Sequence, residues 1–292
     1  MLVQELLERR FGFSRNNIEV LTDEAATRAG MLSAFQRLSE ATGADDTIYI
    51  HFSGHGSQVD DLNGDEADGN DETLLPHDAR TAGIADITDD ELGMLLASLP
   101  SERVFVVLDA CHSCTATRSG VALKARVTPP DARTDLYSDF AEAPADSGAL
   151  RHVLMTGAAE NQSALDGPID DGRHYGMFTL SLARTLERLP ASSSARTIHR
   201  EVRMEMQRIG DQFGLYAIPL SQLEGDEATL DTAFLEVGDG ARRAWFGVSP
   251  GKDGSATMDG AARFGAQEGS LWAVYPPGET TFRPVDVNAI LS

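Results

Sequence analysis

Short apolar runs followed by small and polar residues mark the hydrophobic pattern of this chain. Residues 47–52 (Thr-Ile-Tyr-Ile-His-Phe) and 104–108 (Val-Phe-Val-Val-Leu) are rich in β-branched and aromatic residues, with polar or turn-forming residues on both sides. Such runs are typical of strands that are buried on both faces of a parallel sheet. Residues 152–157 show a similar pattern, so we expect three strands of one sheet.

Segments with apolar residues at helical spacing alternate with these strands. The pattern predicts a helix over residues 2–10 and another over 24–42, with Asp23 as the cap of the second. Further elements are expected at 18–21 (a strand) and at 89–99, 177–189 and 195–213 (helices). This alternation implies an α/β domain in which helices cover both faces of a mostly parallel sheet.

Two regions lack this alternation. Residues 118–150 are rich in Pro, Ala, Asp and Ser and have weak periodicity, so we expect a long exposed connection. After residue 235, short β-type segments are separated by Gly, Asp and Pro, which predicts a small β-rich module. We therefore expect one domain over residues 1–235 and the β-rich module over 236–292.

The composition narrows the class of protein. With 292 residues, 41% of them hydrophobic, the chain can bury a substantial core. A formal net charge of −22 argues against nucleic acid and anionic membranes as partners, because both bind basic surfaces. No run approaches the ~18 apolar residues of a membrane span, and no secretion signal opens the chain. The two cysteines, Cys111 and Cys114, cannot cross-link a fold of this size, and their scarcity fits the reducing cytoplasm.

A histidine and a cysteine follow the first two predicted strands. His55 belongs to the segment 51–56 (His-Phe-Ser-Gly-His-Gly), and Cys111 belongs to the segment 109–113 (Asp-Ala-Cys-His-Ser). Ligands gather outside the carboxyl ends of strands in open α/β sheets, so both side chains should lie at one edge of the sheet. We predict Cys111 as a nucleophile and His55 as its general acid and base. His51, inside the strand, is expected to be a core residue.

These motifs, with others in the same order, resemble the metacaspases and bacterial caspase-like peptidases of peptidase family C14. The resemblance covers about residues 1–235 and includes the segments 11–13, 18–23, 71–78, 87–92, 152–158, 176–179 and 222–225. It implies a three-layer α/β/α caspase-like fold. It also implies a cysteine endopeptidase that cleaves peptide bonds after Arg or Lys through a thioester acyl-enzyme. The family's first strand is missing from this sequence, so either the true start lies upstream or the member is shortened. In both cases we expect an exposed edge or gap in the sheet.

The resemblance also implies roles around the Cys–His dyad. The backbone N–H groups of Gly56 and Cys111 would form the oxyanion hole. Ser53 and Asp109 would line a pocket for a basic substrate side chain, because a carboxylate pairs with Arg or Lys. A strand-end or helix-capping role is the alternative for Asp109. Candidate self-cleavage sites in the connection, which the enzyme's own specificity would recognise, are Lys124, Arg126 and Arg133. Ordinary solubilising charge is the alternative for these three.

The calcium-activated members of the family hold the ion with four aspartates. Three of these positions correspond to Asp71, Asp89 and Asp90, but the fourth is occupied by Arg118. A cation in place of a ligand should weaken Ca²⁺ binding or replace the ion. We therefore expect no required cofactor, with Ca²⁺ disfavoured by Arg118. Residues 61–65 begin like an EF-hand loop, but Glu66 stands at its glycine position.

Two other functions stay open. A catalytically weak caspase-like scaffold would bind partners through its fold and β-rich module, and the missing first strand supports this alternative. The presence of both His55 and Cys111 argues against it. A metal site from Cys111, His112 and Cys114 with His55 is the other alternative, but this cysteine and histidine spacing is unusual for structural zinc. The leading prediction is a peptidase whose partners are proteins or peptides with basic residues.

Overall fold

The structure is a computed structural model that describes residues 2–64, 66, 68–111, 123–137, 152–159, 162–169 and 173–235, with two strands beyond them. The chain divides into two compact units, Met1–Gly240 and Ala241–Ser292. In the second unit, β11 (Val248–Pro250) and β12 (Ala256–Met258) form an antiparallel pair. The predicted division of the chain after residue 235 stays a prediction.

The first unit is built on a four-stranded sheet with the order β1-β5-β7-β10. The strands β1 (Thr47–Ser53), β5 (Arg103–Asp109) and β7 (His152–Thr156) are parallel, and β10 (Gln222–Glu224) joins β7 in the antiparallel direction. This arrangement confirms the mostly parallel sheet. Within the described part of the chain, β1 is one edge of this sheet. The register pairs Ser53 with Asp109, so β1 and β5 end side by side.

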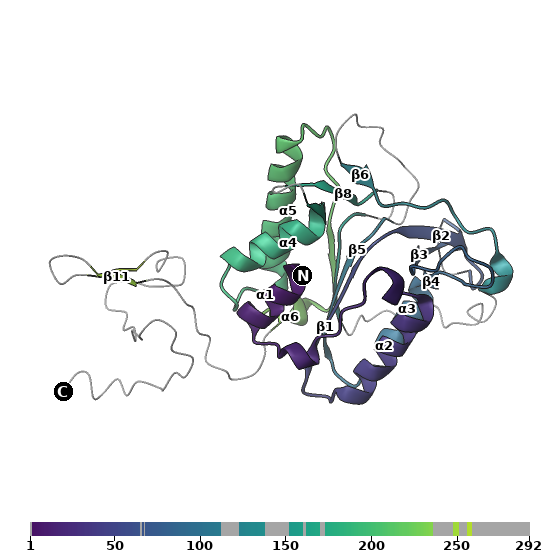
Figure 1. The fold of residues 1–292 in the computed structure, drawn as a ribbon, viewed down its shortest axis with the longest axis horizontal. Helices are drawn as coiled ribbons and strands as arrows, with labels where there is room; N and C mark the ends of the chain where they lie inside the picture. Colours follow the sequence, from purple (N-terminus) through teal and green to yellow (C-terminus); the bar gives the residue numbers. More distant parts are fainter. Residues whose placement is uncertain are drawn as a thin grey trace. The chain divides into compact units, whose positions relative to one another are not determined.

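Helices cover both faces of the sheet because successive side chains of each strand point in opposite directions. Phe105 and Val107 of β5 pack in one core with α1 (Leu2–Phe11), α4 (Met177–Arg188), α5 (Ala195–Gln212) and α6 (Glu227–Leu230). Val104 and Val106 pack in the other core with α2 (Arg28–Ala41) and α3 (Asp89–Ala97). Figure 1 shows α1, α4 and α5 on one side of the sheet and α2 and α3 on the other. The three layers of an α/β/α domain are therefore present.

Smaller sheets extend the ends of the central strands. β2 (Gly56–Asp60), β3 (Asn70–Leu74) and β4 (Ile87–Thr88) form one of them. The other consists of β6 (Lys124–Ala125), β8 (Leu165–Pro168) and β9 (His174–Gly176). The sequence pattern did not predict these strands, because they are short and rich in polar residues and glycine.

Two local predictions are wrong. The segment 18–21 forms no strand: Ile18 has an extended backbone, but no strand lies beside it among the described residues, and a ladder needs a partner. Asp23 does not cap α2, because it lies in a short 3-10 helix, Asp23–Ala25. Thr27 is the cap instead, and its hydroxyl accepts a hydrogen bond from the Gly30 N–H at 3.1 Å.

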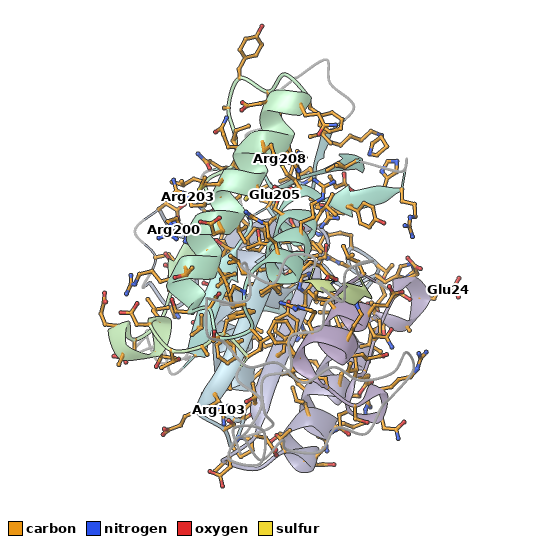
Figure 2. The ribbon with its side chains drawn as sticks, turned by 90° about the vertical axis from the view of Figure 1, so that its left-hand side faces the viewer. Glu24, Arg103, Arg200, Arg203, Glu205 and Arg208 are labelled. Atoms are coloured by element: carbon orange, nitrogen blue, oxygen red, sulfur yellow. The ribbon has the colours of Figure 1, made fainter. Side chains whose placement is uncertain are left out.

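The helix α5 shows how the sequence pattern sets the outer layer. Its buried residues, among them Ile198, Val202 and Met206, recur at three- and four-residue spacing. Arg200, Arg203 and Arg208 lie along the same helix in Figure 2, with Glu205 among them. Glu205 pairs with Arg184 of α4 at 2.9 Å, which ties the two helices together at their rim. In the described part of the chain, no helix is long and apolar enough to cross a membrane.

The aromatic contacts of Phe234 give a test of the core. Its ring is fully buried and meets the rings of Phe105 and Tyr49 edge to face, at centroid distances of 5.0 and 6.4 Å. We expect Phe234→Ala to lower the free energy of unfolding by about 3–5 kcal/mol, since the substitution leaves a cavity beneath the sheet. Urea denaturation measures this change. Tyr216→Ala is the matched control, because Tyr216 is fully exposed. A loss for Phe234→Ala no larger than for the control would contradict this packing.

Candidate active site

The carboxyl ends of β1 and β5 are joined by backbone contacts around His55. The Gly54 N–H donates to the Asp109 carbonyl at 3.2 Å, and a Cβ on Gly56 would overlap the carbonyl oxygen of Cys111. Glycine is therefore needed at position 56 for the two loops to approach. The His55 side chain is exposed, and its carbonyl accepts a hydrogen bond from the Leu75 N–H at 3.0 Å. The predicted dyad residues thus lie on loops that pack against each other.

Cys111 is a buried thiol. Its Sγ donates to the carbonyl of Ala164 at 3.1 Å, and the residue has no exposed surface. Burial raises the pKa of the thiol to about 11, although hydrogen bonds from the Arg126 backbone and the Ser163 side chain act in the opposite direction. In this conformation the thiol is protonated at neutral pH.

Asp109 is a fully buried carboxylate between β5 and α4. Its Oδ2 accepts hydrogen bonds from the Thr179 N–H at 2.9 Å and from the Thr179 hydroxyl at 2.6 Å. Thr179 lies in the first turn of α4, so Asp109 caps this helix from a neighbouring strand. Its Oδ1 has no hydrogen-bond partner among the described residues. Burial raises the pKa of Asp109, and the nearby Arg126 guanidinium opposes that effect.

A segment of the predicted connection lies across this site. In the docked segment, residues 123–131, β6 pairs with β8 in the antiparallel direction. The Arg126 N–H then donates to the Ala164 carbonyl at 3.1 Å, and the Gly56 N–H donates to the Arg126 carbonyl at 3.2 Å. Thr128 continues the contact along β2, donating its N–H to the Gly56 carbonyl at 3.0 Å. The docked segment is therefore held in extended form on both sides of Arg126.

The side chain of Arg126 lies against Ser53 and Asp109, the two residues predicted to line a pocket for a basic group. Its Nη1 donates to the Ser53 hydroxyl at 2.6 Å and to the Asp109 carbonyl at 3.0 Å, and lies 3.6 Å from Asp109 Oδ2. Its Nε lies 3.5 Å from Asp166 Oδ2. Gly176 lies directly beside these groups, since a Cβ at this position would overlap Asp109 Oδ2 and lie 2.9 Å from Arg126 Nη1. The structure thus brings together Ser53, Asp109 and Arg126.

The other two candidate cleavage residues lie elsewhere. Lys124 is exposed on β6. Arg133 pairs with Asp131 at 2.7 Å and donates to the carbonyls of Thr81 and Ile84, so its side chain is engaged outside the pocket. Of the three candidates, only Arg126 lies beside Asp109.

The described part of the predicted connection, residues 123–137, contains both exposed and buried residues. Leu123, Asp131 and Tyr137 are all buried. The Tyr137 hydroxyl donates to Asp131 Oδ2 at 2.8 Å, and it accepts the Asp86 N–H at 3.0 Å. Arg133 and Tyr137 together hold the pKa of Asp131 well below its usual range. Residues 123–137 are weakly periodic because non-local polar contacts, rather than an apolar stripe, hold them in place.

A chain of hydrogen bonds lies behind the pocket. The His51 ring contacts the Tyr49 hydroxyl at 2.9 Å through Nδ1 and the Thr179 hydroxyl at 3.1 Å through Nε2. The same Thr179 hydroxyl bonds to Asp109. Burial and the positive charge of Arg126 lower the pKa of His51 to about 4, so the ring is neutral at pH 7. His51 therefore supports Asp109 indirectly through Thr179, a role that the sequence did not indicate.

Carboxylates gather at a second place, between β3 and α3. Oxygen atoms of Glu66, Glu72 and Asp89 lie within 4.8 Å of one another. Of the three predicted calcium ligands, only Asp89 belongs to this cluster. Asp90 instead accepts a hydrogen bond from the Asn63 amide at 2.7 Å. The predicted residues His112, Cys114 and Arg118 lie outside the described residues.

Sequence reasoning missed several residues of the pocket. Thr179 and Gly176 lie in a segment whose resemblance to the family was noted, but their contacts with Asp109 depend on the fold. Asp166 lies on β8, which was not predicted, and Ala164 directly precedes that strand. The sequence shows an Asp-Gly pair at residues 166–167 and a glycine at 176. Neither feature indicates that these residues contact Asp109 or Arg126.

Comparisons with known proteins agree with this architecture. The metacaspase, peptidase C14 domain family matches residues 1–119. Metacaspase-1B of Aspergillus oryzae is 29% identical over 246 residues, which is 69% of this chain and 58% of that protein. Metacaspase-1B of Aspergillus fumigatus is 34% identical over 188 residues, which is 59% of this chain and 44% of that protein. The crystal structure of protein GSU0716 from Geobacter sulfurreducens superimposes with a TM-score of 0.53 at 23% identity, over 80% of this chain and 89% of that one.

These matches confirm the predicted resemblance and the caspase-like α/β fold. Residues 1–119 match the metacaspase, peptidase C14 domain, and the chain resembles caspase-like peptidases beyond it. It spans about half the length of the two metacaspases named above.

The low pKa of His51 predicts an acid-sensitive stability. The unfolded chain takes up a proton on this ring near pH 6.5, whereas the folded protein does so only near pH 4. The neutral His51 ring therefore contributes fully to the free energy of unfolding above about pH 6.5. This contribution falls as the pH decreases toward 4, by at most about 1.4 kcal/mol per pH unit. Urea unfolding between pH 7 and 4.5 should show a shallower loss for His51→Gln than for the wild type.

His77→Gln is the control for this measurement, because His77 is exposed. It should keep the pH dependence of the wild type. An imidazole resonance of His51 that titrates near pH 6.5 in the folded protein would refute the prediction.

Proposed function

We propose that this chain is a cysteine endopeptidase that cleaves peptide bonds after Arg or Lys, with Cys111 as nucleophile and His55 as general acid and base. The observation that carries the proposal is the position of Arg126. Its side chain lies between Ser53 and Asp109, and its carbonyl accepts the Gly56 N–H beside Cys111. A substrate with a basic residue before the cleaved bond would make the same contacts. The buried carboxylate of Asp109 disfavours an acidic residue there.

The first half of the reaction forms an acyl-enzyme. The thiolate of Cys111 attacks the carbonyl carbon of the basic residue, and a carbon–sulfur bond forms. The oxygen becomes negatively charged and is held by the N–H groups of Gly56 and Cys111. The carbon–nitrogen bond then breaks, and the amine leaves with a proton from His55. The product is a thioester on Cys111.

The second half regenerates the enzyme. His55 removes a proton from water, which attacks the thioester carbonyl. The carbon–sulfur bond breaks, the thiolate of Cys111 returns, and the carboxylic acid product leaves. Because the thiol is buried and bonded to Ala164 while the docked segment is in place, we assign the described conformation to a resting state.

The contacts of Arg126 and the net charge of the chain indicate which partners it would bind. We propose protein or peptide substrates with basic residues, since the formal net charge of −22 favours them and disfavours nucleic acid. We also propose a reducing, cytoplasmic location, because the reaction needs Cys111 as a thiol.

Calcium would fit the carboxylates of Glu66, Glu72 and Asp89, which supply the oxygen ligands that it prefers. A bound ion would neutralise this acidic cluster at the start of α3. We propose that catalysis does not require it, because Arg118 replaces one of the family's aspartates.

The reaction predicts a clear response in a peptide panel. Fluorogenic peptides that end in Arg, Lys or Asp should be assayed with Arg126→Gln, which leaves the pocket without its guanidinium. We expect cleavage of the Arg and Lys peptides, none of the Asp peptide, and equal rates in EDTA and Ca²⁺. Adding Cys111→Ala should lower kcat/KM at least about a thousandfold.

Cys114→Ala is the control for this assay, since Cys114 has no role in the proposed reaction. A folded but inactive Arg126→Gln chain would favour the scaffold alternative. Activity that EDTA abolishes and Ca²⁺ alone restores would overturn the calcium proposal while leaving the peptidase intact.

The position of Arg126 also predicts one self-cleavage site. Incubation of the wild-type chain should give fragments 1–126 and 127–292, because the Arg126–Val127 bond lies beside Cys111. Intact-mass spectrometry identifies both fragments. Arg126→Gln should remove this cleavage.

Lys124→Gln is the matched control, since Lys124 lies two residues before Arg126 in the docked segment and is exposed. It should leave the cleavage in place. Fragments that end at Lys124 or Arg133 would contradict the assignment.

A further inference from the structure

We propose that Asp166 makes the pocket prefer Arg over Lys as the residue before the cleaved bond. This inference rests on the proposed function and specifies the substrate of the same site. Its basis is the division of the Arg126 contacts between the two ends of the guanidinium. Nη1 faces Ser53 and Asp109, whereas Nε lies 3.5 Å from Asp166 Oδ2.

Lysine can reproduce only one of these two sets of contacts. An ammonium at the position of Nη1 would still bond to Ser53 and the Asp109 carbonyl, because these need one donor at the end of the side chain. Lysine has no donor at the position of Nε, where arginine carries an N–H on its stem. Asp166 would then face methylene groups and lose a charge-assisted contact. The pocket without Asp166 would accept both residues.

Asp166 is placed by the strands that line the site. It pairs with Gly176 of β9 in the antiparallel ladder and with Lys124 of β6 on its other side. The absence of a Cβ on Gly176 lets the guanidinium pass between Asp166 and Asp109. The side chain of Asp166 is 29% exposed, while that of Asp109 is fully buried. Asp166 therefore stands at the mouth of the pocket and Asp109 at its base.

The two carboxylates also act on each other. The charge of Asp166 contributes to the raised pKa of Asp109, and the Arg126 guanidinium opposes that effect. A single cation that bridges both carboxylates relieves their repulsion, and the extended guanidinium spans them better than an ammonium. The preference thus comes from geometry and from charge together.

The test compares peptides that are identical except for Arg or Lys before the cleaved bond. The full chain with Arg126→Gln serves as the reference, and Asp166→Asn is added to it. We expect Asp166→Asn to lower kcat/KM for the Arg peptide about tenfold, because the variant removes the ion pair with Nε. The Lys peptide should change less than about threefold, so the Arg/Lys ratio collapses. Asp166→Glu should restore part of the ratio.

Two controls separate the possible failures. Asp211→Asn removes one exposed carboxylate from α5 and should leave the ratio unchanged. Asp109→Asn should lower kcat/KM for the Arg peptide and the Lys peptide to a similar extent. If the reference cleaves both peptides and Asp166→Asn keeps the ratio, the role of Asp166 is overturned and the peptidase stands. If the reference cleaves neither peptide while folded, the proposed function itself fails, and the preference fails with it.

Discussion

The buried carboxylate of Asp109 is the constraint on which the site depends. A carboxylate without exposed surface is costly unless hydrogen bonds or a cation stabilise it. The first turn of α4 supplies two hydrogen bonds through Thr179, and the guanidinium of Arg126 supplies the positive charge. The position of Asp109 at the end of β5 therefore determines where α4 begins and what kind of side chain the pocket can hold. The same carboxylate therefore caps α4 and, in the proposed function, would bind the basic side chain of a substrate.

The docked segment is fixed at two separate places. Before Arg126, β6 pairs with β8, and after it the buried network of Asp131, Tyr137 and Asp86 anchors the chain. Breaking one peptide bond between these anchors leaves both ends attached. Release of the pocket therefore depends on the ladder between β6 and β8, which is only two residues long, more than on the buried network. The weaker of the two anchors lies on the side that fills the pocket.

How much of this structure could be predicted depends on how local its causes are. The strands 47–53 and 103–109 followed from their apolar runs, and their shared direction placed His55 and Cys111 near each other. The strand β8 and the contacts of Asp166 could not be predicted, because a four-residue strand with Asp, Gly and Pro has no distinctive period. The position of the Arg126 side chain also depends on contacts with residues that are distant in the sequence. Three basic residues in the connection were equal candidates by sequence, and only the network around Asp131 separates Arg133 from Arg126.

The environment of Cys111, the proposed nucleophile, depends on the docked segment. Burial is the largest cause of the raised pKa of Cys111, and the Arg126 backbone N–H, which also bonds to the Ala164 carbonyl, opposes that effect. If the docked segment withdrew, the sulfur would lose this hydrogen bond from Arg126, and water would take its place. In the proposed mechanism His55, which is exposed on the adjacent loop, would accept the thiol proton at that stage. The movement that removes Arg126 from Asp109 would therefore also uncover Cys111 for the proposed reaction.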